Sequence, residues 1–273
     1  MDIFSLFSVA LATVILYFFY DLQKTSNKRR HLLKKIAIYH DKERSKRERI
    51  QPIANYEQIT RLNFRQLQQN LHNGTLTCLE VLKAYQYAAL LNTEATNSVT
   101  EFIEEAERTA EQLDLSNNHR LPLHGIPFSV KECLTIKGTE STEGHSQFLG
   151  VYNNHETAPI VKFLQLYGAI PFVKTNVPQA LVSFDSRNGI HGITKHPMDQ
   201  TRSPGGSTSG EGALVGGKSS ILGVGTDSGG SLRIPVSHHF SVSFFIKMKS
   251  ASLIAFVLSK HVLSFRPSLM SRI

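Results

Sequence analysis

The chain opens on an apolar run followed by a basic one. Residues 3–20 carry no charged side chain, whereas residues 24–49 are rich in Lys and Arg. An apolar run of this length is near the lower limit for a helix that crosses a hydrocarbon core of about 30 Å. Because the positive charges follow the run, unlike those of a signal peptide, the pattern predicts an uncleaved transmembrane anchor over residues 1–22. A helix or hairpin buried in the protein core is the alternative.

Helical periodicity dominates the next part of the chain. Residues 23–60 are expected to form a basic juxtamembrane helical connector, in which the pattern of residues 33–49 is helical and polar on most faces and so predicts a solvated segment. Two amphipathic helices are expected on either side of Asn73 and Gly74, and a third over residues 99–114. The apolar positions expected to face the core of the first two are Phe64, Leu67, Leu71, Leu79, Leu82, Tyr85 and Leu90.

Strand patterns begin after residue 120. Residues 123–138 contain a short run of branched apolar residues opened by Gly-Ile-Pro, which indicates a strand, and residues 158–178 read as a helix, a glycine turn and a strand. Helices that alternate with strands over more than a hundred residues favour an α/β fold. We therefore expect a domain over residues 61–235 with a mixed β-sheet covered on both sides by helices.

The last part of the chain has a different composition. Residues 236–273 contain no glycine and no acidic residue, but nine serines and five Lys or Arg. Because domain cores rarely have this composition, we expect an atypical tail, an aberrant or alternative terminus that leaves the fold incomplete at its C-terminus.

Charge and cysteine content exclude several classes of function. The net charge is +8, and residues 24–49 alone hold eleven Lys or Arg against three acidic residues, so the rest of the chain is neutral. A basic segment next to an anchor favours anionic lipid headgroups over nucleic acid. Cys78 and Cys133 are too few for a disulfide framework and belong to no ligand cluster, so we expect no metal.

A glycine-rich stretch, residues 203–235, holds ten of the eighteen glycines and permits two chemistries. Gly212, Gly217, Lys218 and Ser219 match the phosphate-binding pattern GxxxxGK[ST]. That loop needs a buried strand before its first glycine, and the preceding letters, PGGSTSGE, do not supply one. A nucleotide-binding protein is therefore the third of three functional hypotheses.

Nucleophilic catalysis by serine is the second chemistry. Ser231 follows Gly229 and Gly230, and glycines let successive backbone N–H groups converge on one point, as an oxyanion requires. A serine nucleophile also needs a base. Lys131 lies within the apolar strand, where burial would lower its pKa and leave it neutral. An ordinary charge at the edge of the sheet is the alternative for this lysine.

Residues 121–235 resemble the amidase signature family. The resemblance rests on PLHGIPFSVKECLTIKG, GAIPFVKTNVPQ and the glycine-rich stretch, which occur in order and with the spacing of the family. The anchor and the helical residues 63–114 further resemble the membrane-bound fatty-acid amide hydrolases within it. The resemblance implies an α/β amidase signature fold.

The resemblance also implies a mechanism and its residues. It makes Ser231 the nucleophile, Ser207 a bridging serine and Lys131 the base of a Ser-Ser-Lys triad that cleaves amide bonds through an acyl-enzyme. The backbone N–H groups expected to form the oxyanion hole are those of Ser228, Gly229, Gly230 and Ser231. We expect Asp227 and Arg233 to fix the loop backbone.

The resemblance implies a fatty-acid amide as substrate, a membrane as partner and neither cofactor nor nucleic acid, and it allows a homodimer. The expected location is an endomembrane, with the catalytic part on the cytoplasmic side. Family members continue past residue 235, so we expect a C-terminally truncated member. A catalytically inactive form that only binds a membrane or a partner is the second functional hypothesis.

Overall fold

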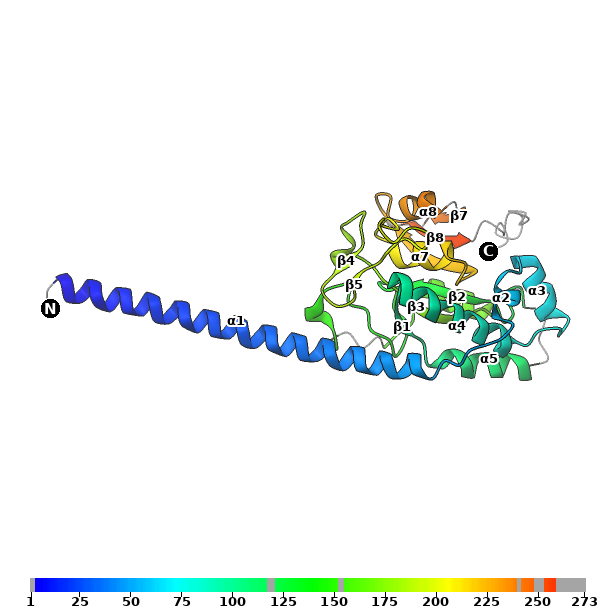
Figure 1. Ribbon diagram of the computed structural model, residues 1–273, viewed down its shortest axis with the longest axis horizontal. Helices are drawn as coiled ribbons and strands as arrows, with labels where there is room; N and C mark the ends of the chain where they lie inside the picture. Colours follow the sequence, from blue (N-terminus) through cyan, green and yellow to red (C-terminus); the bar gives the residue numbers. More distant parts are fainter. Residues whose placement is uncertain (1–2, 117–120, 152–154, 240–241, 248–252, 259–273) are drawn as a thin grey trace. The chain divides into compact units, whose positions relative to one another are not determined.

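The computed structural model describes the backbone of residues 3–116, 121–151, 155–239, 242–247 and 253–258 (Figure 1). The chain divides into two compact units, Met1–Lys42 and Glu43–Ile273. The α-helices are α1 Ile3–Glu48, α2 Tyr56–Thr60, α3 Phe64–His72, α4 Cys78–Thr96, α5 Glu105–Leu115, α6 Pro159–Leu166, α7 Ser209–Gly216 and α8 Arg233–His239. The strands are β1 Val99–Phe102, β2 Pro127–Lys131, β3 Ile170–Thr175, β4 Arg187–Asn188, β5 Gly192–Ile193, β6 Leu222–Asp227, β7 Val242–Lys247 and β8 Leu253–Leu258.

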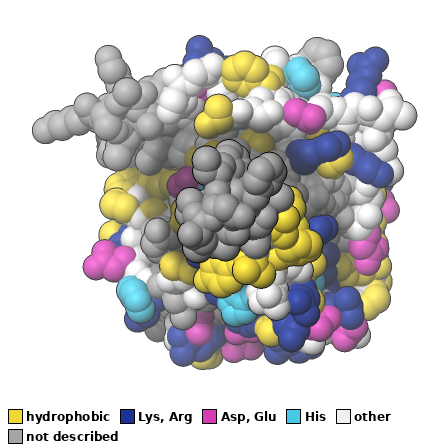
Figure 2. Space-filling view, turned by 90° about the vertical axis from the view of Figure 1, so that its left-hand side faces the viewer, with side chains coloured by type: hydrophobic (Ala, Val, Ile, Leu, Met, Phe, Trp, Pro, Cys, Tyr) yellow, Lys and Arg dark blue, Asp and Glu magenta, His cyan; other side chains and the backbone are white. Residues whose placement is uncertain are grey.

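The first unit consists of the helical residues of α1 up to Lys42. Figure 2 shows hydrophobic side chains gathered near the centre of the view, and residues 14–20 of this helix are exposed and mostly apolar. The side chains of residues 1–12, which belong to the predicted anchor, lie outside the described part. Among the residues that are described, no helix is long and apolar enough to cross a membrane.

The two predicted amphipathic helices are confirmed as α3 and α4. Each begins with a capping box, in which the side chains of Asn63 and Thr77 accept hydrogen bonds from backbone N–H groups three residues later. The predicted core positions of α3 are buried, and so are Leu82 and Tyr85 of α4. Capping residues and apolar periodicity therefore act together to determine where these two helices form.

The prediction of a third helix over residues 99–114 is wrong for the first turn. Val99–Phe102 forms the strand β1, and the helix α5 begins only at Glu105. β1 pairs antiparallel with β3, and Val99 and Phe102 are buried. Branched and aromatic residues suit a half-buried sheet, and pairing with a distant strand overrides the helical periodicity that continues into this segment.

The main sheet is mixed, as predicted. Its strand order is β1-β3-β2-β6-β8-β7, with β2 parallel to both β3 and β6, while β1 and β8 run antiparallel to their neighbours. Helices α4, α5, α6 and α7 pack against this sheet. The parallel strands β2 and β3 are buried along their whole length, which explains why most of their residues are apolar.

The sheet continues beyond the point where the sequence pattern predicts its end. β8 pairs antiparallel with β6 from Leu222↔Leu258 to Asp227↔Leu253, and β7 pairs with β8. Both strands come from the predicted atypical tail, of which residues 240–241, 248–252 and 259–273 lie outside the described residues. The edge of β6 is therefore covered, contrary to the expectation of a sheet that stops at residue 235.

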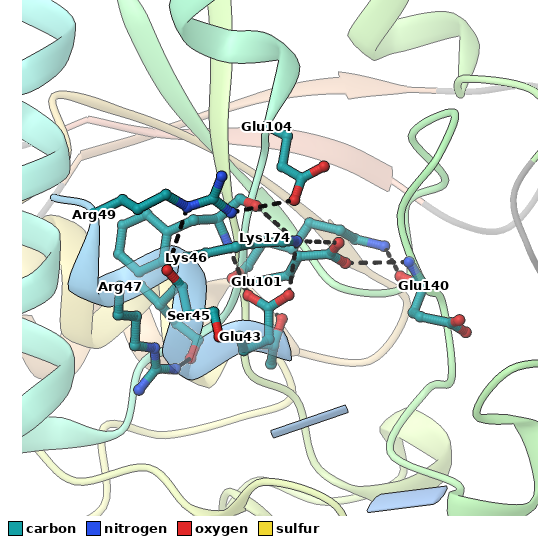
Figure 3. A network of polar contacts seen from close by, with 12 residues as sticks. Glu43, Ser45, Lys46, Arg47, Arg49, Glu101, Glu104, Glu140 and Lys174 are labelled. Carbon is teal, nitrogen blue, oxygen red and sulfur yellow. Dashed lines mark hydrogen bonds and ion pairs between the residues drawn. The ribbon is translucent and has the colours of Figure 1, made fainter. Parts of the chain in front are cut away.

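A buried ion cluster fastens the end of α1 to β1 within the second unit (Figure 3). The Nζ atom of Lys46 lies 2.7 Å from Glu43 Oε1 and 3.0 Å from Glu101 Oε1, and all three side chains are buried. Burial alone would lower the pKa of Lys46, but the two carboxylates more than offset it and raise the pKa above its usual value. The end of α1, which lies within the predicted solvated connector, is thus part of the core.

The cluster extends towards β3 through a loop. The N–H of Glu140 donates to Glu101 Oε2 at 3.1 Å, and Lys174 Nζ donates to the carbonyl of Glu140 and to Ser141 Oγ. Figure 3 shows Lys174 and Glu140 beside Glu101 in this arrangement. The network therefore joins α1, β1, β3 and the loop after β2.

Replacement of Lys46 by Ala should destabilise the second unit, because it leaves two buried carboxylates without their cation. We expect the free energy of unfolding in a urea titration to fall by about 3–5 kcal/mol. Arg49→Ala is the matched control, since Arg49 faces Glu104 at 3.7 Å with both side chains more than half exposed. Its loss should change stability by less than about 1 kcal/mol. Equal losses for the two variants would contradict a structural role for the cluster.

Candidate active site

Lys131 ends β2 at the sheet edge where the parallel strand β6 also ends. Its side chain is fully buried, and Nζ donates to Ser207 Oγ at 2.9 Å. Nζ also donates to Thr226 Oγ1 at 2.9 Å and to the Thr226 carbonyl at 3.3 Å. The structure thus brings together two residues that are 76 positions apart in the sequence and that the resemblance pairs in one site.

The environment of Lys131 favours its neutral form. Burial lowers the pKa of this lysine below its usual value, because the ammonium loses its hydration. Nearby acids raise the pKa when they are ionised, without cancelling the effect of burial, and they are Cys133, Asp227, Glu211 and Glu143. Lys131 is therefore not an ordinary charge at the edge of the sheet.

The loop that carries Ser207 leaves no room for a side chain at Gly206. A Cβ atom on Gly206 would lie 2.6 Å from the carbonyl oxygen of Ser183, so a larger residue would displace the loop. The next residue, Thr208, donates its N–H to the carbonyl oxygen of Ser231 at 3.0 Å. This bond fixes the Ser207 loop against the loop that carries the predicted nucleophile.

Ser231 is the most accessible of the three predicted triad residues. It lies two residues before α8 and is half-buried, whereas Lys131 and Ser207 are buried. Among the described residues, no hydrogen bond joins the hydroxyl groups of Ser207 and Ser231. The structure therefore contains the contact between base and bridging serine, and the contact between the two serines stays a prediction.

Asp227 organises the loop before Ser231, as expected. Its buried carboxylate accepts the N–H groups of Gly230, Leu232 and Arg233 at 2.7 to 3.1 Å, and Arg233 adds two side-chain bonds of 3.0 Å. Burial alone would raise the pKa of Asp227, but these donors outweigh it and hold the pKa well below its usual value. Asp227 and Arg233 therefore fix the backbone of the loop.

The structure modifies the expected oxyanion hole at Gly230. This residue has φ of +118°, a conformation that favours glycine, and its N–H donates to Asp227 Oδ1. That donor is thus occupied by the loop in this structure, whereas Ser228 and Gly229 are exposed. The glycine pattern alone could not reveal this hydrogen bond, because the acceptor is the side chain of Asp227, which the turn places next to Gly230.

The nucleotide-binding hypothesis does not fit the structure. The helix α7 runs through the phosphate-binding pattern, and Lys218 and Ser219 follow its C-terminal end. A phosphate-binding loop places its lysine where a helix begins, since the N–H groups there attract anions. The carbonyl groups at a helix C-terminus carry partial negative charge and repel them.

Sequence reasoning missed two residues at this site. Thr226 holds the amine of Lys131, and no local pattern marks it out. Glu211 is fully buried in α7, and its protonation state affects the pKa of Lys131. An acid within the small and apolar residues that follow Ser209 is the signal that could have identified it. Within the described residues, no group of three or more His, Cys, Asp or Glu side chains could hold a metal.

Comparison with known proteins places the site in a family. The family described as Amidase matches residues 80–242, which include Lys131, Ser207 and Ser231. A relative named fatty acid amide hydrolase 1, from Caenorhabditis elegans, is 45% identical over 193 residues, or 69% of this chain. An acetamidase from Emericella nidulans is 37% identical over 187 residues, or 67% of this chain.

A solved structure has the same fold over most of the chain. It is described as fatty acid amide hydrolase, superposes with a TM-score of 0.70 at 30% sequence identity, and covers 76% of this chain and 40% of its own. The chain spans about a third of the length of the two curated relatives, 33% and 34% respectively.

Asp227→Ala should destabilise the chain and reduce its sensitivity to acid. The buried N–H groups of Gly230 and Leu232 would lose their acceptor, and we expect unfolding to cost about 1–3 kcal/mol less at neutral pH. Because the pKa of Asp227 is depressed in the folded state, its contribution is present above the unfolded value of 3.8 and is lost as the pH falls below it.

Urea titrations at neutral and acidic pH measure both effects. Asp199→Ala is the control, because this exposed aspartate also accepts a backbone N–H, that of Thr201, and pairs with an arginine. We expect little change for the control. Similar stability of wild type and Asp227→Ala at neutral pH would contradict the role given to Asp227.

Proposed function

The chain belongs to the amidase family, and we propose that it carries the catalytic centre of a serine hydrolase that cleaves amide bonds. One observation carries the proposal: the fully buried amine of Lys131 lies 2.9 Å from Ser207 Oγ, beside the loop that presents Ser231. Because burial lowers the pKa of Lys131, its free amine can accept a proton near neutral pH.

The proposed reaction proceeds by a proton relay. Neutral Lys131 takes the proton of Ser207, which takes the proton of Ser231 as the oxygen of Ser231 attacks the carbonyl carbon of the amide. The relay then runs in reverse and protonates the departing amine, which is a poor leaving group without that proton. Water repeats the cycle on the acyl-enzyme and releases the acid.

Backbone donors stabilise the negative charge that develops on the carbonyl oxygen. The N–H groups of Ser228, Gly229 and Ser231 are the proposed donors, and the bond of Gly230 to Asp227 holds their loop in place. Loss of one donor from such a hole typically lowers the rate by a factor of about 10²–10³. The exposure of Ser228 and Gly229 supports access of a substrate from this side.

Fatty-acid amides are the proposed substrates. A relative and a solved structure that resemble the chain bear the name fatty acid amide hydrolase, and a somewhat less similar relative is named acetamidase. Apart from water, the proposed chemistry uses only side chains and backbone groups of the protein. A comparison of long-chain with short-chain amides distinguishes the two classes of substrate.

A fluorophosphonate probe, which reacts with activated serines, should label the folded chain at Ser231. Ser231→Ala should abolish the labelling, whereas Ser237→Ala, which removes an exposed hydroxyl on α8, should leave it unchanged. A long-chain primary amide should protect against labelling at lower concentration than acetamide. Folded protein that is not labelled would contradict the proposal and favour the inactive form.

The same assay tests the base. Lys131→Met should slow labelling by a factor of about 10²–10⁴, because a general base contributes that much to the rate. Lys162→Met is the control, since this lysine is more than half exposed and lies 4.0 Å from Glu156. An unchanged labelling rate in Lys131→Met would exclude the proposed relay.

We also propose that α1 attaches the chain to a membrane, with the catalytic part on the cytoplasmic side of an endomembrane. The apolar residues 14–20 are exposed, and the basic residues 24–49 follow them. The expressed chain should stay with the membrane pellet after alkaline carbonate extraction, and a variant without residues 1–22 should not. Release of the complete chain by carbonate would contradict the anchor.

A further inference from the structure

The side chain of Glu211 is a buried acid that the proposed relay does not use. It is fully buried in α7, and Thr175 Oγ1 donates to its Oε1 atom at 2.9 Å. Its Oε2 atom is hydrogen-bonded to Ser129 Oγ. Among the described residues, no Lys, Arg or His nitrogen lies within ion-pair distance of this carboxyl group. A carboxylate buried without a cation is costly, and protonation removes that cost.

The hydroxyl groups around Glu211 can form one continuous chain of hydrogen bonds that begins at the proton of its carboxyl group. Ser220 donates to the carbonyl oxygen of Leu222 at 2.9 Å, so the oxygen of Ser220 is available to accept from Ser129 at 3.0 Å. The oxygen of Ser129 can then accept a hydrogen, which a protonated Glu211 supplies. Every donor in this chain has an acceptor, and the chain ends on a backbone carbonyl.

The surroundings of the carboxyl group exclude larger groups. A Cβ atom on Gly223 would lie 2.2 Å from Glu211 Oε2, so β6 passes directly against the carboxyl at a position without a side chain. Burial raises the pKa of Glu211 to about 8, and hydrogen bonding with Ser129 and Thr175 and the proximity of Lys131 offset this rise only in part.

Glu211 is linked to both halves of the proposed relay. Ser129 and Lys131 are two residues apart on β2 and therefore point to the same face of the sheet, and Thr175 is the register partner of Lys131 on β3. The helix α7, which carries Glu211, begins two residues after Ser207. The carboxyl group thus connects the helix behind the bridging serine to the strands around the base.

We propose that Glu211 is a positioning residue that stays protonated at neutral pH, where it fastens α7 to β2 and β3 and leaves Lys131 in its neutral form. The inference rests on the proposed function, since it assigns Lys131 the role of base. An ionised Glu211 would stabilise the ammonium form of Lys131 and remove the base.

Other titratable groups also face Lys131. They are Cys133 beyond the end of β2, Asp227 at the end of β6 and Glu143 in the loop after β2. Burial raises the pKa of the Cys133 thiol, which keeps it neutral. Asp227 is already paired with Arg233, and Glu143 is exposed to solvent, which screens its charge. Glu211 is therefore the remaining buried group whose protonation state can change the charge on Lys131.

Infrared spectroscopy tests the protonation state without any assay of activity. The difference spectrum between wild type and Glu211→Gln at neutral pH should contain the C=O stretching band of a protonated carboxyl group, and this band should disappear as the pH rises through about 8. Its absence at neutral pH would overturn the proposal. Isotope-labelled glutamate identifies the band in wild type if the Gln variant does not fold.

Ser129→Ala provides a second spectroscopic test. This variant removes the acceptor of the Glu211 proton, so the carbonyl band should move to higher frequency. A band that stays in place would show that Glu211 does not donate to Ser129.

The pH dependence of labelling tests the effect on Lys131. Gln is neutral and nearly isosteric with a protonated Glu, so in Glu211→Gln the midpoint of the acidic limb should move by less than about half a pH unit, with the rate within a few-fold of wild type. Glu211→Leu, which is neutral but makes no hydrogen bonds, should label more slowly and melt at a lower temperature, with the same midpoint.

A fall of the midpoint by about one unit or more in both variants would show that wild-type Glu211 is ionised, and would overturn the proposal. These experiments distinguish failure of the proposed function from failure of the proposal for Glu211. If wild type is not labelled at all, the proposed function fails, while the infrared band still decides the state of Glu211.

Discussion

The contact between the buried amine of Lys131 and the hydroxyl of Ser207 is the interaction on which the described site depends. It requires that β2 and β6 run parallel, so that Lys131 and Thr226 meet at one edge of the sheet. It also requires the close approach of the loop at Gly206. A lysine in such a place loses its hydration, and this loss lowers its pKa and so shifts the protonation equilibrium towards the neutral amine.

Burial sets the charge of several groups around this contact, and each is balanced differently. Asp227 stays ionised because backbone N–H groups and Arg233 supply its hydrogen bonds. Glu211 has only hydroxyl partners within the described part of the chain, which suits a protonated acid. Lys46, far from these groups in sequence, keeps its charge because two carboxylates surround it. Ion pairing, hydrogen bonding and protonation are three ways to satisfy a buried ionisable group.

The fold was predictable where local signals and tertiary pairing agree. The helices α3 and α4 combine capping residues with apolar periodicity, and β2 and β3 are short apolar runs bounded by glycine or proline. Prediction failed at β1, where a helical pattern continues into a segment that pairs with a distant strand. It also failed after residue 235, since composition says little about whether a hairpin can extend a sheet.

The sequence by itself determined which residues are available for chemistry: a lysine in an apolar strand, two serines among glycines, and an acid with an arginine six residues later. Only the tertiary structure decided what they do. It brought Lys131 within 2.9 Å of Ser207 and turned the Gly230 N–H towards Asp227. It also enclosed Glu211 among hydroxyl groups. The reason is physical, because hydration, hydrogen-bond partners and pKa values depend on neighbours in space, and these neighbours come from segments far apart in the chain.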